Sequence, residues 1–195
     1  MRVLMSGSSG LIGKALAGRL ERQGHTVVRL TRLDSAAPPG ATAPPGATAP
    51  PGAAGPAAPP EASPPPAHTA FPNPSTAPIL AVPWDPPNGK LDRTALEALG
   101  PYDGVVHLAG AGIGDRRWTS ARRREILASR TESTRTLAQT LISLDPVPPV
   151  LVSASAVGFY GDRGDQELTE DDGPGVGFLA DVCRAWASNS VIVYV

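Results

Sequence analysis

A glycine-rich turn between a short strand and a helix constrains the fold of this chain more than any other feature of its sequence. The segment Gly7–Gly13 reads GSSGLIG, with glycine at its first, fourth and seventh positions. Arg2–Met5 is a short, mostly apolar run typical of a buried strand. Leu11–Gln23 has one apolar helical face, formed by Leu11, Ile12, Ala15, Leu16 and Leu20, and Gly24 closes the segment. The sequence therefore predicts a strand, a tight turn and a helix in direct succession.

The three glycines suit a turn that holds a pyrophosphate. Gly7 permits the tight turn, Gly10 lets backbone amides approach the anion, and Gly13 lets helix and strand pack closely. The spacing differs by one residue from the usual G-x-G-x-x-G pattern, so a merely tight turn is the alternative. If the nucleotide interpretation holds, the contacting residues of this segment are Gly7, Ser9, Gly10, Leu11, Ile12 and Gly13.

The rest of the chain alternates apolar strand-like runs with helical segments. Further strands are expected at His25–Leu30, Pro78–Trp84, Gly104–Ala109 and Pro149–Ala154, and helices at Leu91–Leu99, Ser120–Leu144 and Phe178–Ala187. This order favours an α/β fold, a Rossmann-like doubly wound parallel sheet, as a single domain over residues 1–34 and 79–187.

Proline is concentrated in one stretch of the chain. Eighteen of the 23 prolines lie between Pro38 and Pro87, and the hexapeptide APPGAT occurs twice in succession from Ala37. Such a composition buries little and favours polyproline II. We predict a disordered Pro/Ala/Gly-rich insert over residues 35–78; a ligand for a proline-recognising module is the alternative.

Charge and cysteine content exclude several function classes. A net charge of −1 makes nucleic acid an unexpected partner, and one cysteine rules out an internal disulfide framework. No apolar run approaches the ~20 residues of a membrane span, and the N-terminus lacks a signal-peptide pattern. The three histidines are too scattered for a metal site. We expect a cytoplasmic protein, with an organelle still open, that binds a small-molecule substrate; its oligomeric state stays open.

The end of the second predicted strand bears on the choice of cofactor. NAD-binding domains place an acidic residue there for the ribose 2′-hydroxyl. Here Arg32 stands at that point, and a guanidinium suits the 2′-phosphate of NADP. The alternative is a solvated Arg32 with Asp34 as the ribose contact. The sequence favours NADP, with NAD possible.

Several further motifs together resemble one family. They are SGSSGLIG (6–13), LTR (30–32), VPWD (82–85), DGVVHLAGAGIGDRRW (103–118), SRTEST (129–134), SASAVGFYG (153–161), TEDD (169–172) and GFLADVCRAW (177–186). The chain is similar to the extended, epimerase-like branch of the short-chain dehydrogenase/reductase superfamily. More narrowly, it resembles the epimerase family labelled 39U, or cell-division-inhibitor-like.

The resemblance implies roles for particular residues. Leu108, Ala109 and Gly110 would lie against the adenosine and ribose side of the cofactor, and Asp85 would approach the adenine amino group unless it is only a turn acid. Ser155 stands where the superfamily places its catalytic serine. Ser153 is the nearby alternative and is also a candidate cofactor contact. Thr134 matches a structural threonine of the long helix.

The usual catalytic pair of the superfamily is absent. Its enzymes use Tyr-x-x-x-Lys, in which the lysine and the cofactor lower the pKa of the tyrosine. The only lysines here are Lys14 and Lys90, neither of them four residues after a tyrosine. The resemblance places the two missing residues at Leu179 and Cys183. Tyr160 is a candidate substitute acid, or simply a turn residue.

Two other features leave alternatives open. Arg116, Arg117 and Arg122–Arg124 could bind a phosphorylated substrate or form a solvated helix face. The resemblance stops after Trp186, so residues 188–195 read as a divergent tail, and we expect a chain truncated relative to the family. The leading hypothesis is an NAD(P)-binding epimerase- or dehydratase-like oxidoreductase of unknown substrate. The alternatives are a non-catalytic NADP-binding regulatory protein and an inactive fragment.

Overall fold

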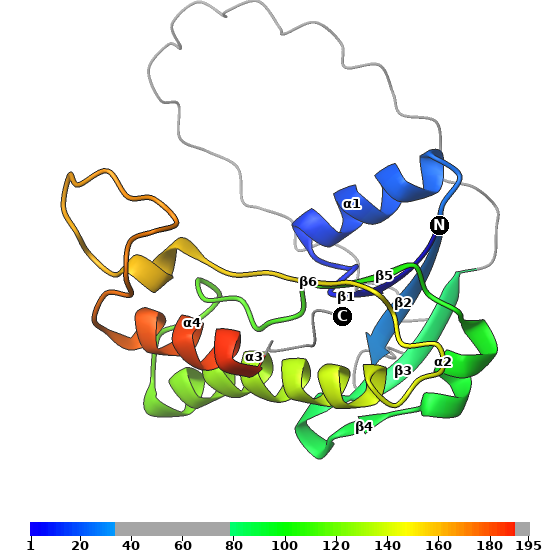
Figure 1. Cartoon of the computed structure of the whole chain (residues 1–195). Coiled ribbons are helices and arrows are strands. Elements are labelled where there is room, and N and C mark those ends of the chain that lie inside the picture. The colour runs from blue at the N-terminus through cyan, green and yellow to red at the C-terminus, as the bar shows by residue number, and fades with distance from the viewer. Residues whose placement is uncertain (34–78, 190–195) are drawn as a thin grey trace, which may run out of the picture.

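The computed structural model describes residues 1–33 and 79–189 (Figure 1). The predicted insert over residues 35–78, the end of the tail from residue 190 and the alternative ribose contact Asp34 lie outside the described residues.

A six-stranded sheet in the order β4-β3-β2-β1-β5-β6 forms the centre of the described part of the chain. Its strands are β1 (Arg2–Ser6), β2 (Thr26–Arg32), β3 (Leu80–Asp85), β4 (Lys90–Leu91), β5 (Gly104–His107) and β6 (Leu151–Ser153). Each pairing is parallel except that of β3 with β4. The predicted Rossmann-like α/β fold is confirmed.

The short antiparallel strand β4 corrects the sequence interpretation. It occupies the start of the segment predicted as a helix from Leu91, and helix α2 (Arg93–Leu99) begins only after it. The Asp92 side chain caps α2 by accepting a hydrogen bond from the Ala95 amide at 3.0 Å. A strand of two residues has no periodicity to reveal it, and a capping aspartate marks the true start of the helix.

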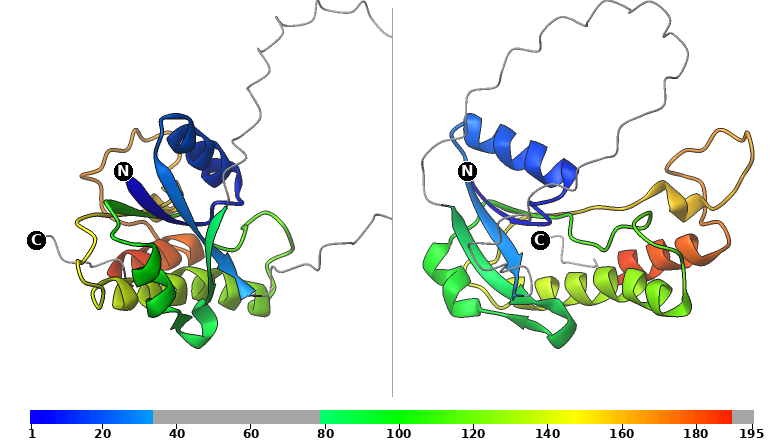
Figure 2. Two further views of the ribbon diagram at one scale, coloured as in Figure 1. Left: turned by 90° about the vertical axis from the view of Figure 1, so that its right-hand side faces the viewer. Right: turned by 180° about the vertical axis from the view of Figure 1, so that it is seen from behind.

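Helices cover both faces of the sheet (Figures 1 and 2). Helix α1 (Leu11–Arg22) lies on one face, while α3 (Ser120–Leu141) and α4 (Phe178–Asn189) lie side by side on the other. Two short 3-10 helices, Pro86–Asn88 and Val157–Tyr160, follow β3 and β6. Among the described residues, no helix is long and apolar enough to cross a bilayer.

The core divides between these two faces because successive residues of a strand point to opposite sides. Leu4 belongs to the larger buried cluster, which includes Trp84 and Leu137, while Met5 packs with Ala17 of α1. The side chains of Leu4 and Met5, which are neighbours on β1, are both fully buried. This two-sided burial explains why the central strands read as continuous apolar runs.

The apolar face expected for α1 is wrong at its first turn. Leu11 and Ile12 are 90% and 69% exposed, whereas Gly13 and Ala17 are buried. Each helical residue turns by about 100°, so Leu11 lies roughly opposite the side on which Gly13 and Ala17 meet the sheet. Small residues line the buried side because helix and sheet approach closely there.

Candidate functional site

The site is built where the order of the strands reverses. From β1 the chain continues through β2 to β3 on one side, whereas β5 and β6 lie on the other side of β1. The segments that follow β1 and β5 therefore meet at the carboxyl edge of the sheet, where such folds bind ligands. These segments are the glycine turn and Leu108–Gly110, and the Leu108 amide donates to the Ser6 carbonyl at 3.2 Å.

Two glycines of the turn are required by close backbone contacts. Gly7 has φ of +71°, and a Cβ there would lie 2.6 Å from the carbonyl carbon of Leu108. A Cβ on Gly13 would overlap the carbonyl oxygen of Gly7. Gly13 thus allows α1 to start directly against the turn. The motif predicts close packing of the helix on the strand, whereas the atoms nearest Gly13 belong to Gly7 and Ser8 of the turn.

The start of α1 leaves backbone donors facing this edge. Its N-cap is Gly10, which supplies no side-chain cap, and the Lys14 amide donates to the Gly10 carbonyl at 2.9 Å. The first amides of a helix have no acceptor within the helix, and they carry its positive dipole end. A phosphate group fits this arrangement of donors.

A cavity of about 350 Å³ lies against the glycine turn. It is lined by Gly7–Gly10, Leu30–Arg32, Trp84 and Leu108–Gly110. The cavity thus joins the ends of β1, β2 and β5. Seven of the predicted cofactor residues line it: Gly7, Ser9, Gly10, Arg32, Leu108, Ala109 and Gly110.

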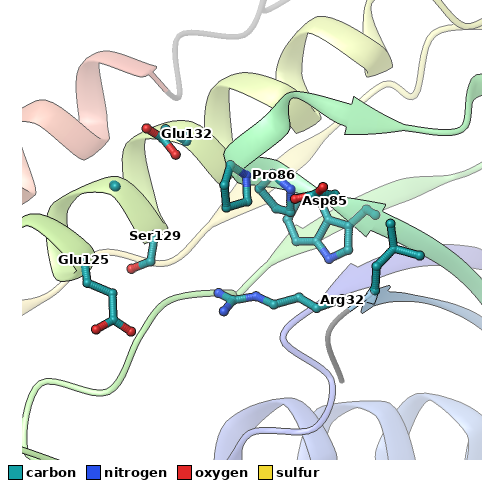
Figure 3. A pocket seen from close by; sticks show the side chains of 10 residues that line it. Arg32, Asp85, Pro86, Glu125, Ser129 and Glu132 are labelled. Atoms are coloured by element: carbon teal, nitrogen blue, oxygen red, sulfur yellow. The ribbon is translucent and has the colours of Figure 1, made fainter. Parts of the chain in front are cut away.

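A second cavity of about 290 Å³ lies between the end of β3 and helix α3 (Figure 3). Asp85 and Pro86 form one side, and Glu125, Ser129 and Glu132 of α3 form the other. Arg32 lines this cavity as well as the first one, and its side chain points across it toward α3. Asp85 accepts a hydrogen bond from Asn88 Nδ2 at 2.7 Å while its carboxylate remains in the cavity wall.

Four other predicted cofactor residues are not in either cavity wall. Leu11 and Ile12 project from the first turn of α1, and Gly13 is buried beneath it. Ser153, at the end of β6, donates a hydrogen bond to the Ala154 carbonyl at 3.4 Å. The structure thus groups Gly7–Gly10, Arg32, Asp85 and Leu108–Gly110, while these four residues line neither cavity.

The two predicted catalytic residues lie on the segment after β6, outside both cavity walls. Ser155 is exposed, and Tyr160 ends the 3-10 helix with its ring 5.2 Å from that of Phe159. This segment packs against α4. Their roles stay predictions.

The two positions of α4 where the resemblance expects a catalytic pair face the same segment. A Cβ on Gly158 would lie 3.1 Å from the Leu179 Cβ, and the Cys183 thiol lies 3.7 Å from the Ala156 carbonyl oxygen. Burial raises the pKa of the Cys183 thiol, partly offset by the nearby Arg130. At these two positions α4 thus carries an apolar side chain and a buried thiol.

A buried polar network next to the site escaped the sequence interpretation. His107 is fully buried; its Nδ1 lies 2.6 Å from Ser6 Oγ and its Nε2 3.0 Å from Thr134 Oγ1. Trp186 Nε1 donates to the same Thr134 oxygen at 3.0 Å. Burial lowers the pKa of His107 to about 4, so the ring is neutral at pH 7. The network ties β1, β5, α3 and α4 together, and Thr134 has the structural place that the resemblance implied.

Part of the basic cluster is structural rather than a solvated face. Arg122 is only 6% exposed; it donates to the Gly112 carbonyl and pairs with Asp115 at 3.3 Å and Glu125 at 2.7 Å. Its Nε has no hydrogen-bond partner among the described residues. Arg122 therefore anchors the segment that follows Gly110. The spacing of the arginines could not predict this role of Arg122, because the carbonyl that accepts its hydrogen bond belongs to Gly112, on a loop.

Comparison with known proteins gives one consistent family. Residues 3–176 match the NAD dependent epimerase/dehydratase family. An epimerase family protein of Mycobacterium bovis, Mb2239, is 32% identical over 184 residues, which cover 94% of this chain and 46% of that protein. The epimerase family protein SDR39U1 of Bos taurus is 27% identical, with 95% and 47% covered. The chain spans about half the length of the curated relatives it matches.

Solved structures agree on the fold. Human epimerase family protein SDR39U1 (isoform 2) with NADPH superposes with a TM-score of 0.64 at 23% identity, over 99% of this chain and 50% of that one. MoeE5 in complex with UDP-glucose and NAD gives a TM-score of 0.61 at 19% identity, with 97% and 48% covered. These structural neighbours were solved with NADPH or with NAD.

Proposed function

Because this chain belongs to the NAD dependent epimerase/dehydratase family, we propose that it binds NADP(H) and acts as an oxidoreductase or epimerase on a small-molecule substrate. The glycine turn and the uncapped start of α1 would hold the pyrophosphate. Leu108–Gly110 and Asp85 would flank the adenosine. Bound there, the dinucleotide would supply hydride transfer at its nicotinamide ring.

The position of Arg32 is the observation that favours NADP(H) over NAD(H) in this proposal. It ends β2 and lines both cavities, so a ligand that leaves the glycine turn toward Asp85 must pass its guanidinium. Arginine is always protonated at neutral pH and presents a planar fork that suits a phosphate. A 2′-phosphate next to Arg32 would gain charge-assisted hydrogen bonds that NAD(H) cannot make.

Replacing Arg32 with alanine should weaken NADPH binding by about tenfold or more, the usual effect of one charged hydrogen-bond donor. NADH, which lacks the 2′-phosphate, should bind the variant and the wild type equally. Isothermal titration calorimetry with both dinucleotides measures the difference.

Arg19→Ala is the matched control, because Arg19 is an exposed arginine in the last turn of α1 and lines neither cavity. It should leave both affinities unchanged. Equal losses for NADPH and NADH in Arg32→Ala would refute the 2′-phosphate assignment. No binding of either dinucleotide to the wild type would refute the proposed function as a whole.

For the reaction itself, we propose that Ser155 donates a hydrogen bond to the substrate carbonyl oxygen and that Tyr160 serves as the acid. The exposure of Ser155 beyond the end of β6 is compatible with substrate access. In the described residues, Lys14 and Lys90 are exposed and lie on α1 and β4. The phenol of Tyr160 therefore has no lysine partner from the superfamily's pattern.

This arrangement predicts slow turnover that depends on Ser155. With NADPH and a panel of carbonyl compounds, Ser155→Ala should lower kcat/KM by about 10²-fold, and Tyr160→Phe by a comparable factor. Stopped-flow absorbance of NADPH oxidation would measure both. Ser143→Ala is the control, because Ser143 is an exposed serine just after α3 that lines neither cavity.

Rates that are equal in all four proteins would contradict the catalytic proposal. They would favour the second candidate, a dinucleotide-binding regulatory protein without catalysis. The burial of Cys183 and the packing of Leu179 onto Gly158, at the positions of the missing catalytic pair, are the observations that support it.

A further inference from the structure

The guanidinium of Arg130 lies where α3, α4 and the segment after β5 meet. Its Nη1 donates to the Ala111 and Ile126 carbonyls, both at 3.1 Å. Its Cζ lies 5.3 Å from the centre of the Trp186 ring on α4, within the range of a cation–π contact. One charged side chain is thus held in a fixed place by backbone and aromatic partners.

Arg130 also reaches the edge of the cavity at the glycine turn. A Cβ on Gly110 would lie 3.2 Å from the Arg130 Cζ and 3.4 Å from its Nη2. Gly110 lines that cavity, and a side chain there would crowd the Arg130 guanidinium. Arg130 therefore packs against Gly110, which lines the same cavity as Arg32.

The charge of Arg130 also reaches the α4 position that a catalytic lysine would occupy. Arg130 acts on the Cys183 thiol and favours its ionised form. Burial lowers the pKa of Arg130, yet a guanidinium stays protonated in proteins. A permanent cation from α3 thus acts at Cys183, the α4 position where the resemblance expects the lysine.

We propose that Arg130 is a binding residue for the nicotinamide-side half of the dinucleotide, where it replaces the missing lysine of α4 as the cation of the site. The inference rests on the proposed function. A dinucleotide with its pyrophosphate at the glycine turn and its adenosine between Arg32 and Leu108–Gly110 would continue with its other half past Gly110, the last residue of that segment. There the second arm of Arg130, Nη2, would donate to ribose or phosphate oxygens.

The competing explanation is purely structural, because Nη1 already fastens Ala111 to α3. Two substitutions separate the two roles. Arg130→Gln keeps a donor that can reach a carbonyl but removes the charge, whereas Arg130→Lys keeps the charge and loses the fork.

The test compares two probes by isothermal titration calorimetry: NADPH, and 2′,5′-ADP, which has the adenosine and its 2′-phosphate but no nicotinamide half. Arg130→Gln should weaken NADPH about tenfold and leave 2′,5′-ADP within about twofold. Arg130→Lys should keep NADPH within about threefold of the wild type. Arg135→Gln removes the same charge from an exposed position of α3 and should change neither affinity.

The outcomes distinguish this inference from the proposed function. If the wild type binds NADPH but Arg130→Gln binds it equally well, or loses both probes equally, the inference fails while the proposed function stands. If the wild type binds neither probe, both fail. If Arg130→Gln does not fold, the Arg130→Lys protein provides the test. If this protein loses about tenfold or more of its NADPH affinity while its affinity for 2′,5′-ADP is unchanged, the charge of Arg130 does not have the proposed role.

Discussion

Replacing Gly7 with alanine should destabilise the domain by roughly 3 kcal/mol or more. The left-handed φ of +71° costs an alanine about 1–2 kcal/mol. In addition, its Cβ would lie 2.6 to 2.8 Å from backbone atoms of Leu108 and Ala109, which cannot move without disturbing β5. Urea unfolding followed by circular dichroism would measure the loss.

Gly24→Ala is a matched control because Gly24 also has a left-handed φ, +79°, but nothing within 4 Å of its Cβ position. It should cost only the backbone term, about 1–2 kcal/mol. If the two substitutions destabilise the protein equally, the close approach of the glycine turn to Leu108 is not what requires Gly7. A folded Gly7→Ala protein should also bind NADPH more weakly, because the turn must widen.

Lowering the pH from 6.5 to 4 should reduce the free energy of unfolding by about 3 kcal/mol, because His107 is protonated less readily in the folded domain than in the unfolded chain. The buried ring has a pKa of about 4, below the ordinary 6.5 that it regains on unfolding. As the pH falls below 6.5, the unfolded chain takes up the proton first, so stability decreases. Below about pH 4 both states are protonated, and this group adds no further loss.

The measurement is the free energy of unfolding at a series of pH values for wild type, His107→Gln and His25→Gln. His107→Gln should be less stable at pH 7 and should lose most of the slope between pH 6.5 and pH 4. His25→Gln, which changes a half-buried histidine outside the network, should keep the slope. An unchanged slope in His107→Gln would show that its ring titrates normally in the folded state.

The features that the sequence predicted well are encoded locally. The strand, turn and helix around Gly7–Gly13 appear where the glycine spacing and apolar runs placed them. Arg32 and Asp85 come to one cavity because parallel strands bring their carboxyl ends to one edge, so the alternating pattern was sufficient. The predicted buried face of α1 is wrong at Leu11 and Ile12, because apolar composition does not say which side of a helix touches the sheet.

The features that the sequence missed depend on contacts between distant segments. His107 meets Ser6 from β1 and Thr134 from α3, separations of 101 and 27 residues along the chain. Arg122 reads as one member of a basic cluster until the loop carbonyl of Gly112 is brought to it. Nothing in the spacing of these residues indicates that they meet.

The sequence by itself determined the fold class, the glycine turn and the absence of Tyr-x-x-x-Lys, because each of these is a matter of residue type and local spacing. Only the tertiary structure decided which charges face the site. Arg122 is buried and structural, while Arg130, eight residues further along the same helix, packs against Gly110 of the cavity wall. The physical reason is that one helix presents its arginines to different neighbours, and the packing of α3 against the sheet and α4 selects among them.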